Sequence, residues 1–69
     1  MSNIKASIII PCYNAEKWVE KTVTSALSQT HSNTEVIVVD NESTDRSYDI
    51  VKKMLDGNPK LTLDVAENI

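Results

Sequence analysis

Two short polar segments, each directly after an apolar run, carry the side chains best suited to ligand chemistry. They are Pro11-Cys12-Tyr13-Asn14 and Asp40-Asn41-Glu42-Ser43. The first offers an aromatic face from Tyr13 and a rigid turn from Pro11. The second offers the Asp40 carboxylate as an acceptor for a ring N–H or a hydroxyl. These residue types predict recognition of a neutral polar group.

Three apolar runs predict the strands that position these segments. Residues Ala6 to Ile10 are rich in β-branched side chains and stop at Pro11, which predicts a first strand buried on both faces. Residues 35–39 predict a second buried strand that ends at Asp40. Leu61 to Val65 predict a third strand.

Helical spacing of apolar residues between the first two strands predicts a helix from Ala15 to Ser28. Asn14 is placed to cap its first turn, and Trp18 is expected in the core. The polar segment 29–34 is predicted to be a loop in which His31 is solvated.

A second helix is predicted after Asp40, with Ser43 or Thr44 as its cap and Asp45 in its first turn. Gly57 and Asn58-Pro59 should end it. The expected inner stripe of this helix consists of Ser47, Ile50, Val51, Met54 and Leu55.

The predicted order β-α-β-α-β is typical of an α/β fold with a parallel sheet, because such strands are joined by right-handed crossovers. Residues 1–69 contain no internal linker and are expected to form one small domain. Ligands of open parallel sheets bind beyond the carboxyl ends of the strands, which is where both polar segments lie.

Composition excludes several functions. The net charge is −3 and the seven Lys and Arg are scattered, so we expect no nucleic-acid partner. The single glycine rules out Gly-x-Gly-x-x-Gly and the P-loop. The lone Cys12 cannot form an internal disulfide, and no run approaches the ~20 apolar residues of a membrane span. These features predict a soluble, cytoplasmic chain, with membrane association of a full-length protein left open.

The sequence "SIIIPCYNAEKWVEKTVTSALSQT", followed by "EVIVVDNESTD", resembles the start of the family 2 glycosyltransferases. Their usual form is roughly Ile-Ile-Pro-x-Tyr-Asn, then Gln-Thr, then Val-Val-Asp-Asp-Gly-Ser-Thr-Asp. The resemblance runs from about Ser7 to Asn68. It implies the N-terminal half of a Rossmann-like GT-A domain, which binds a nucleotide-sugar.

The resemblance also implies roles for individual residues. Pro11, Cys12 and Tyr13 would border the nucleotide base, with Tyr13 against the ring, and Asp40 would hydrogen-bond the base edge. Glu16 is a candidate for a ribose or base contact. The donor is expected to be a UDP-sugar, whose sugar passes to a hydroxyl of an unidentified acceptor with inversion.

This sequence departs from the family pattern in two ways. Asn41 replaces the usual second Asp, and Glu42 replaces the usual Gly, where glycine would adopt the required backbone angle more readily. The family's Asp-x-Asp, which holds Mn²⁺ or Mg²⁺, and its catalytic base have no counterpart in these residues. We therefore expect no catalytic or metal-binding residue in this chain, and no activity from the chain alone.

Two other interpretations stay open. The first is a small non-enzymatic α/β module that binds a nucleotide or a protein through the same strand ends. The second is a flavodoxin-like or receiver domain, although a receiver should carry an acidic pair where Pro11-Cys12-Tyr13 stands.

Cys12 is expected to be a packed side chain rather than a nucleophile. The uncovered sheet edges also predict self-association or low stability.

Overall fold

A computed structural model describes residues 6–29 and 34–66. His31 and most of the predicted loop around it lie outside the described residues. The described elements follow the predicted order and are β1 (Ala6–Cys12), α1 (Val19–Ser28), β2 (Thr34–Asp40), α2 (Ser47–Met54) and β3 (Leu61–Val65).

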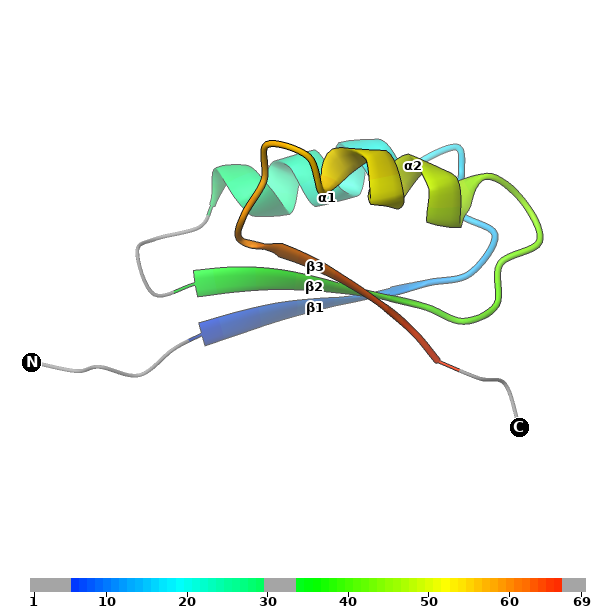
Figure 1. Ribbon diagram of the computed structural model, residues 1–69, viewed down its shortest axis with the longest axis horizontal. Helices are drawn as coiled ribbons and strands as arrows, with labels where there is room; N and C mark the ends of the chain where they lie inside the picture. The colour runs from blue at the N-terminus through cyan, green and yellow to red at the C-terminus, as the bar shows by residue number, and fades with distance from the viewer. Residues whose placement is uncertain (1–5, 30–33, 67–69) are drawn as a thin grey trace, which may run out of the picture.

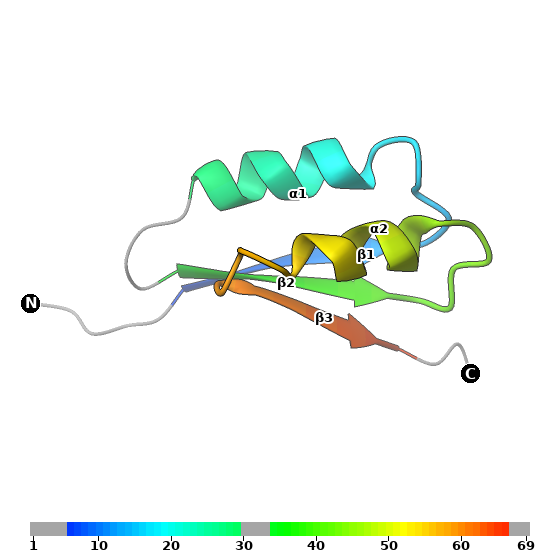
Figure 2. The ribbon, with the colours of Figure 1, turned by 45° about the horizontal axis from the view of Figure 1, so that its top comes forward.

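The three strands form one parallel sheet in the order β1-β2-β3 (Figure 2). Its register places Cys12 opposite Asp40, and Asp40 opposite Val65. The carboxyl ends of all three strands therefore meet at one edge of the sheet. The parallel α/β fold predicted from the sequence is confirmed.

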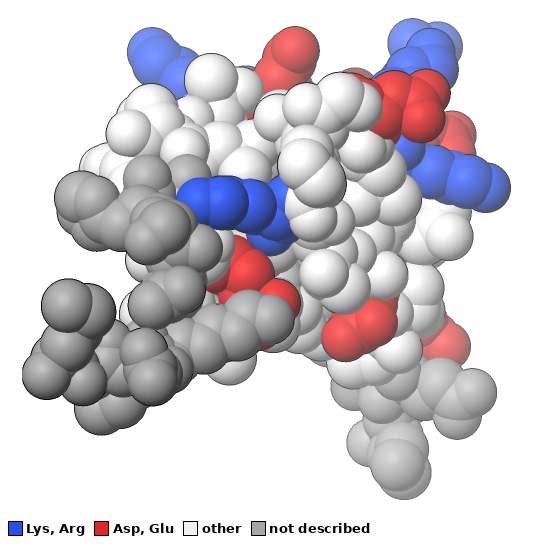
Figure 3. Space-filling view, turned by 60° about the vertical axis from the view of Figure 1, so that its left-hand side comes forward, with Lys and Arg blue, Asp and Glu red and all other residues white. Residues whose placement is uncertain are grey.

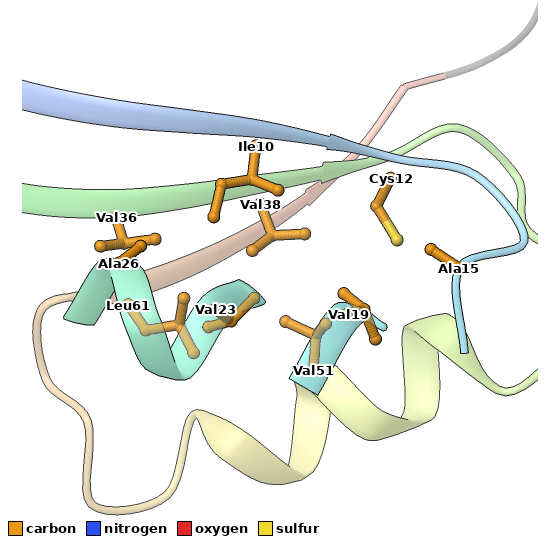
Figure 4. Packing of buried hydrophobic residues seen from close by; sticks show 10 residues of the cluster. All are labelled: Ile10, Cys12, Ala15, Val19, Val23, Ala26, Val36, Val38, Val51 and Leu61. Atoms are coloured by element: carbon orange, nitrogen blue, oxygen red, sulfur yellow. The ribbon is translucent and has the colours of Figure 1, made fainter. Parts of the chain in front are cut away.

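Both helices lie on the same face of the sheet (Figure 1). This follows from the topology, because two successive right-handed crossovers between neighbouring strands return the chain over the same side. The core fills the space between sheet and helices (Figure 4). Its buried members are Ile10, Cys12, Ala15, Val19, Val23, Ala26, Val36, Val38, Val51 and Leu61.

The first strand is buried on one face only, so the prediction that both its faces are buried was wrong. Ile10 points toward the helices and is buried, whereas its neighbour Ile9 is 63% exposed. The same-side helices leave the other face of the described sheet bare. The strand also extends past Pro11 to Cys12. This is compatible with its place at an edge of the described sheet, where proline is tolerated.

Helix α1 begins at Val19 rather than at Ala15. Residues 15–18 form a turn in which the Ala15 carbonyl accepts hydrogen bonds from the N–H groups of Trp18 (3.0 Å) and Val19 (2.8 Å). Asn14 does not cap this helix, because its side chain bonds to the segment after β2 instead. Trp18 is 45% exposed, which corrects the expectation that it lies in the core. The turn takes it out of the buried stripe that begins with Val19.

Helix α2 begins at Ser47, later than predicted, and neither Ser43 nor Thr44 caps it. Its inner face is as expected: Ser47 and Val51 are fully buried. Its end is also as expected. Gly57 has a φ of +82°, the left-handed conformation that glycine adopts easily. Asn58 Nδ2 donates a hydrogen bond to the Met54 carbonyl at 2.6 Å.

Charged side chains of both signs are interspersed on the face shown in Figure 3. Within residues 6–29 and 34–66, neither helix is long and apolar enough to cross a membrane.

Candidate functional site

The segments that follow β1 and β2 are held together by backbone amides that donate to side-chain oxygens. Three successive N–H groups of the first segment point at the second. Asn14 donates to Ser43 Oγ (2.9 Å), Ala15 to Ser47 Oγ (2.6 Å) and Glu16 to Asp45 Oδ2 (3.1 Å). We call residues 14–16 and 43–47 together the loop clasp.

The clasp is reciprocal, because amides of the second segment donate to side chains of the first. The N–H of Thr44 donates to Asn14 Oδ1 at 2.7 Å, and the N–H of Arg46 donates to Glu16 Oε1 at 3.3 Å. Bonds in both directions define the relative position of the two segments. Asn14 reaches Thr44 with a φ of +47°, a left-handed conformation that asparagine tolerates well.

Asp40 ends β2 and points toward the helix side of the sheet, as Val36 and Val38 do. It is only 2% exposed. Both of its carboxylate oxygens are bonded to Ser43, whose N–H donates to Oδ2 (3.1 Å) and whose hydroxyl donates to Oδ1 (2.5 Å). Because each carboxylate oxygen has two lone pairs, these bonds leave further acceptor capacity.

Asp45 links the clasp to the start of α2. Its Oδ1 accepts from both the N–H and the hydroxyl of Ser47, an Asx turn just before the helix. Partial burial raises the pKa of Asp45. The hydrogen bonds from Ser47 and from the Glu16 amide outweigh that contribution, so the net pKa of this carboxyl is lowered. Ionised Asp45 is therefore the form that supports the clasp.

Cys12 lies in the core, beneath the two polar segments. Its side chain is 2% exposed and belongs to the core (Figure 4). Burial, followed by the nearby Asp40 charge, raises the pKa of the Cys12 thiol. A buried protonated thiol is a poor nucleophile, which agrees with the expectation of a packed side chain.

The remaining predicted site residues lie at the surface. Tyr13 is 59% exposed, so its ring is available at the carboxyl edge of the sheet. Pro11 and Glu16 are also exposed, and one oxygen of Glu16 is engaged by Arg46. The structure thus brings the turn of Tyr13 and the segment after Asp40 together. The carboxylates of Asp40 and Glu16 already accept hydrogen bonds from other residues of the chain.

The two positions that depart from the usual family pattern lie next to Asp40. Glu42 has a φ of +53°, a left-handed angle that the glycine of the usual family pattern would adopt more readily. Asn41 is partly buried, and its N–H donates to the Cys12 carbonyl at 2.8 Å. The Asn41 side chain makes no hydrogen bond to any other described residue.

A hollow of about 420 Å³ lies between β1 and α1, lined by residues that include Ile8, Thr22 and Ser25. It contains none of the predicted site residues, which lie at or just after the ends of β1 and β2. Among the described residues, no three His, Cys, Asp or Glu side chains gather closely enough to hold a metal ion.

Sequence reasoning missed the clasp. It interpreted Ser43, Thr44 and Asp45 as caps of the second helix, which their spacing before an apolar stripe also satisfies. In the structure these side chains contact residues 14–16, about thirty positions away in sequence. The sequence did contain one signal for these contacts. Asn14 and Glu16, whose side-chain oxygens accept hydrogen bonds, stand together at the start of the segment that joins the first two strands.

The fold is a parallel α/β domain whose polar segments lie at the carboxyl ends of β1 and β2, the edge at which open parallel sheets bind their ligands. Comparison with known proteins specifies its family. The family model for Glycosyl transferase family 2 matches residues 7–68. This chain therefore belongs to glycosyl transferase family 2, and its three parallel strands are consistent with the N-terminal part of a GT-A Rossmann-like domain.

The similar proteins carry the names of two glycosyltransferases and of a chondroitin synthase. The chain is 50% identical over 50 residues (72% of this chain, 20% of the relative) to UDP-Glc:alpha-D-GlcNAc-diphosphoundecaprenol beta-1,3-glucosyltransferase WfaP of Escherichia coli. It is 34% identical over 64 residues (93% of this chain, 9% of the relative) to glycosyltransferase GlyA of Streptococcus pneumoniae. It is 35% identical over 57 residues (83% of this chain, 6% of the relative) to chondroitin synthase of Pasteurella multocida. The chain thus spans a fifth or less of these relatives.

Proposed function

We propose that this chain is the nucleotide-binding part of an inverting glycosyltransferase that transfers a sugar from a UDP-sugar to an acceptor hydroxyl. Family membership supports the reaction class, and the name of the relative WfaP, which specifies UDP-Glc, supports the uridine nucleotide. The observation that carries the proposal is the exposed Tyr13 ring beside the clasped segment after Asp40. An aromatic ring at that edge is a stacking surface for a base.

The proposed base site consists of Pro11, Cys12, Tyr13, Glu16 and Asp40. Tyr13 stacks on the uracil and Pro11 shapes the turn, while the buried Cys12 contributes packing beneath it. Asp40 offers the base edge a remaining lone pair. The side-chain amide of Asn41, which bonds to no other described residue, is next to it in sequence. Glu16 retains one carboxylate oxygen for a ribose hydroxyl.

The proposed reaction is a single displacement. The acceptor oxygen forms a bond to the anomeric carbon as the bond from that carbon to the diphosphate oxygen breaks, and the acceptor proton passes to a general base. We propose that this base, and the ligands of a Mn²⁺ or Mg²⁺ ion, belong to parts of the enzyme outside residues 1–69. The described residues do not fit a metal site, because no three His, Cys, Asp or Glu side chains among them gather closely enough to hold an ion.

Residues 1–69 are accordingly proposed to be a partial domain that binds the donor without turning it over. The sheet supports this view, because its second face is bare and Ile9 on it is 63% exposed. A bare sheet face and open strand edges also support self-association of the chain.

The proposal is tested by titrating the chain with UDP and following the amide NMR signals of residues 12–16 and 40–43. We expect shifts at both segments, loss of binding in Tyr13→Ala, and its retention in Tyr13→Phe, which keeps the ring. Thr24→Ala on the exposed face of α1 is the matched control. Absence of UDP binding in the unmodified chain would refute the proposal.

Catalysis is tested separately by incubating the chain with UDP-glucose and Mn²⁺ and assaying UDP release. We expect no release above the protein-free rate. Turnover would show that the catalytic groups lie within these residues. Binding of an unrelated protein without any nucleotide affinity would favour the non-enzymatic module.

A further inference from the structure

We propose that Ser43 is a positioning residue for the nucleotide base, an inference that rests on the proposed function. Its hydroxyl stands between the two groups to which that function assigns base recognition. The Ser43 Oγ donates to Asp40 Oδ1 at 2.5 Å and accepts from the N–H of Asn14, the residue after Tyr13, at 2.9 Å. One oxygen atom thus sets the carboxylate and the Tyr13 turn relative to each other.

Ser43 also orients the carboxylate itself. Its N–H donates to Oδ2 while its hydroxyl donates to Oδ1, so the two oxygens are bound by one residue and the carboxylate plane cannot rotate freely. Hydrogen bonds to an ionised group are shorter and stronger than neutral ones. This two-point attachment determines which direction the remaining lone pairs of Asp40 face.

The neighbouring φ of +53° at Glu42 is part of the same arrangement. A left-handed residue is unfavourable for a side chain such as glutamate and persists where the surroundings hold it. The two bonds from Ser43 to Asp40 close the turn that contains Glu42, and they supply that restraint.

Ser47 provides a natural comparison within the same clasp. Its hydroxyl also accepts a backbone amide of the first segment, that of Ala15 at 2.6 Å. It donates to Asp45 rather than to Asp40. Loss of the Ser47 hydroxyl should therefore loosen the clasp without releasing the carboxylate that we assign to the base edge.

Base selectivity distinguishes a positioning role from a merely structural one. Uracil presents an N3–H donor that a carboxylate can accept, whereas N3 of cytosine is itself an acceptor. A loosened fold lowers affinity for UDP and CDP by the same factor. A reoriented Asp40 lowers the affinity for UDP more than that for CDP.

The experiment is to measure UDP and CDP dissociation constants for the 69-residue chain and for Ser43→Ala, Ser43→Thr and Ser47→Ala. For Ser43→Ala we expect the UDP-to-CDP preference to fall about tenfold, the scale of one lost hydrogen bond to a charged group. Ser43→Thr, which keeps a hydroxyl, should retain most of the preference. Ser47→Ala should weaken both nucleotides equally.

An unchanged UDP-to-CDP preference in Ser43→Ala would overturn the inference while leaving UDP binding established. So would a fall of that preference in Ser47→Ala as large as the fall in Ser43→Ala. Equal affinity of the unmodified chain for UDP and CDP would also overturn it. Failure of the unmodified chain to bind UDP would overturn the proposed function itself, and this inference with it. If circular dichroism shows that Ser43→Ala is unfolded, Ser43→Cys takes its place with the same expectation, because a thiol is a weak donor.

Discussion

The backbone N–H of Ala15 donates a 2.6 Å hydrogen bond to the hydroxyl of Ser47, and both residues are buried. The bond joins the start of the first crossover to the start of the second, 32 positions apart in sequence. It is the innermost contact of the clasp.

Removing this hydroxyl should destabilise the fold measurably. In Ser47→Ala the buried Ala15 amide loses its acceptor, and an unsatisfied buried donor costs about 1–3 kcal/mol. Urea unfolding followed by circular dichroism measures the loss. Ser28→Ala is the control, because its hydroxyl makes only an exposed bond within α1 and its removal should change stability by less than about 0.5 kcal/mol. Equal stability of the two variants would contradict this account of the clasp.

Stability should fall on acidification through the titration of Asp45. The folded-state pKa of this carboxyl is lowered below its ordinary value of 3.8, so the folded state favours the ionised form. Its contribution is fully present above about pH 4 and is lost as the pH falls through the lowered folded-state value. Unfolding midpoints between pH 7 and pH 2.5 should show a steeper decline in the unmodified chain than in Asp45→Asn. Parallel curves would argue that Asp45 does not couple the clasp to pH.

Glu42→Gly should stabilise the protein, because Glu42 holds a φ of +53° that favours glycine. The left-handed conformation costs a residue with a side chain about 1–2 kcal/mol, partly offset by the greater freedom of glycine in the unfolded chain. The expected gain in unfolding free energy is about 0.5–1 kcal/mol. It is read from thermal or urea unfolding.

Gly57→Ala tests the same preference for glycine at a left-handed backbone angle, in the opposite direction. Gly57 has a φ of +82°, and an added Cβ would meet no atom within 4 Å, so conformational strain alone should act. We expect a loss of about 1 kcal/mol. If both substitutions shifted stability in the same direction, the backbone angles would not be the cause.

Self-association should depend on the bare face of the sheet. Ile9 is 63% exposed there, and a lysine at this position would place a charge in any contact that buries the face. Light scattering over a range of concentrations should show a larger mean mass for the unmodified chain than for Ile9→Lys. Thr24→Lys adds the same charge to the exposed side of α1 and should leave association unchanged. A concentration-independent monomer would contradict the prediction.

Much of the architecture could be predicted from local patterns. The β-branched runs around Ile10 and Val38 and the 3.6-residue spacing on the second helix determine element types and their order. Gly57 marks the end of the second helix, because few other residues adopt its backbone angle easily. Parallel pairing then follows from the length of the crossovers. These features depend on neighbours in sequence, which is why reasoning from one chain recovers them.

The sequence by itself determined the strands, the helices and the edge of the sheet at which polar residues gather. Only the tertiary structure decided which faces are covered and what the polar side chains contact. Ser43 and Asp45 suit a helix cap as well as a clasp, and the choice depends on residues 14–16 arriving from across the sheet. Ile9 and Trp18 were expected inside on local pattern alone, but burial depends on whether another layer lies over them. A contact between distant segments is a property of their geometry, and no local pattern encodes it.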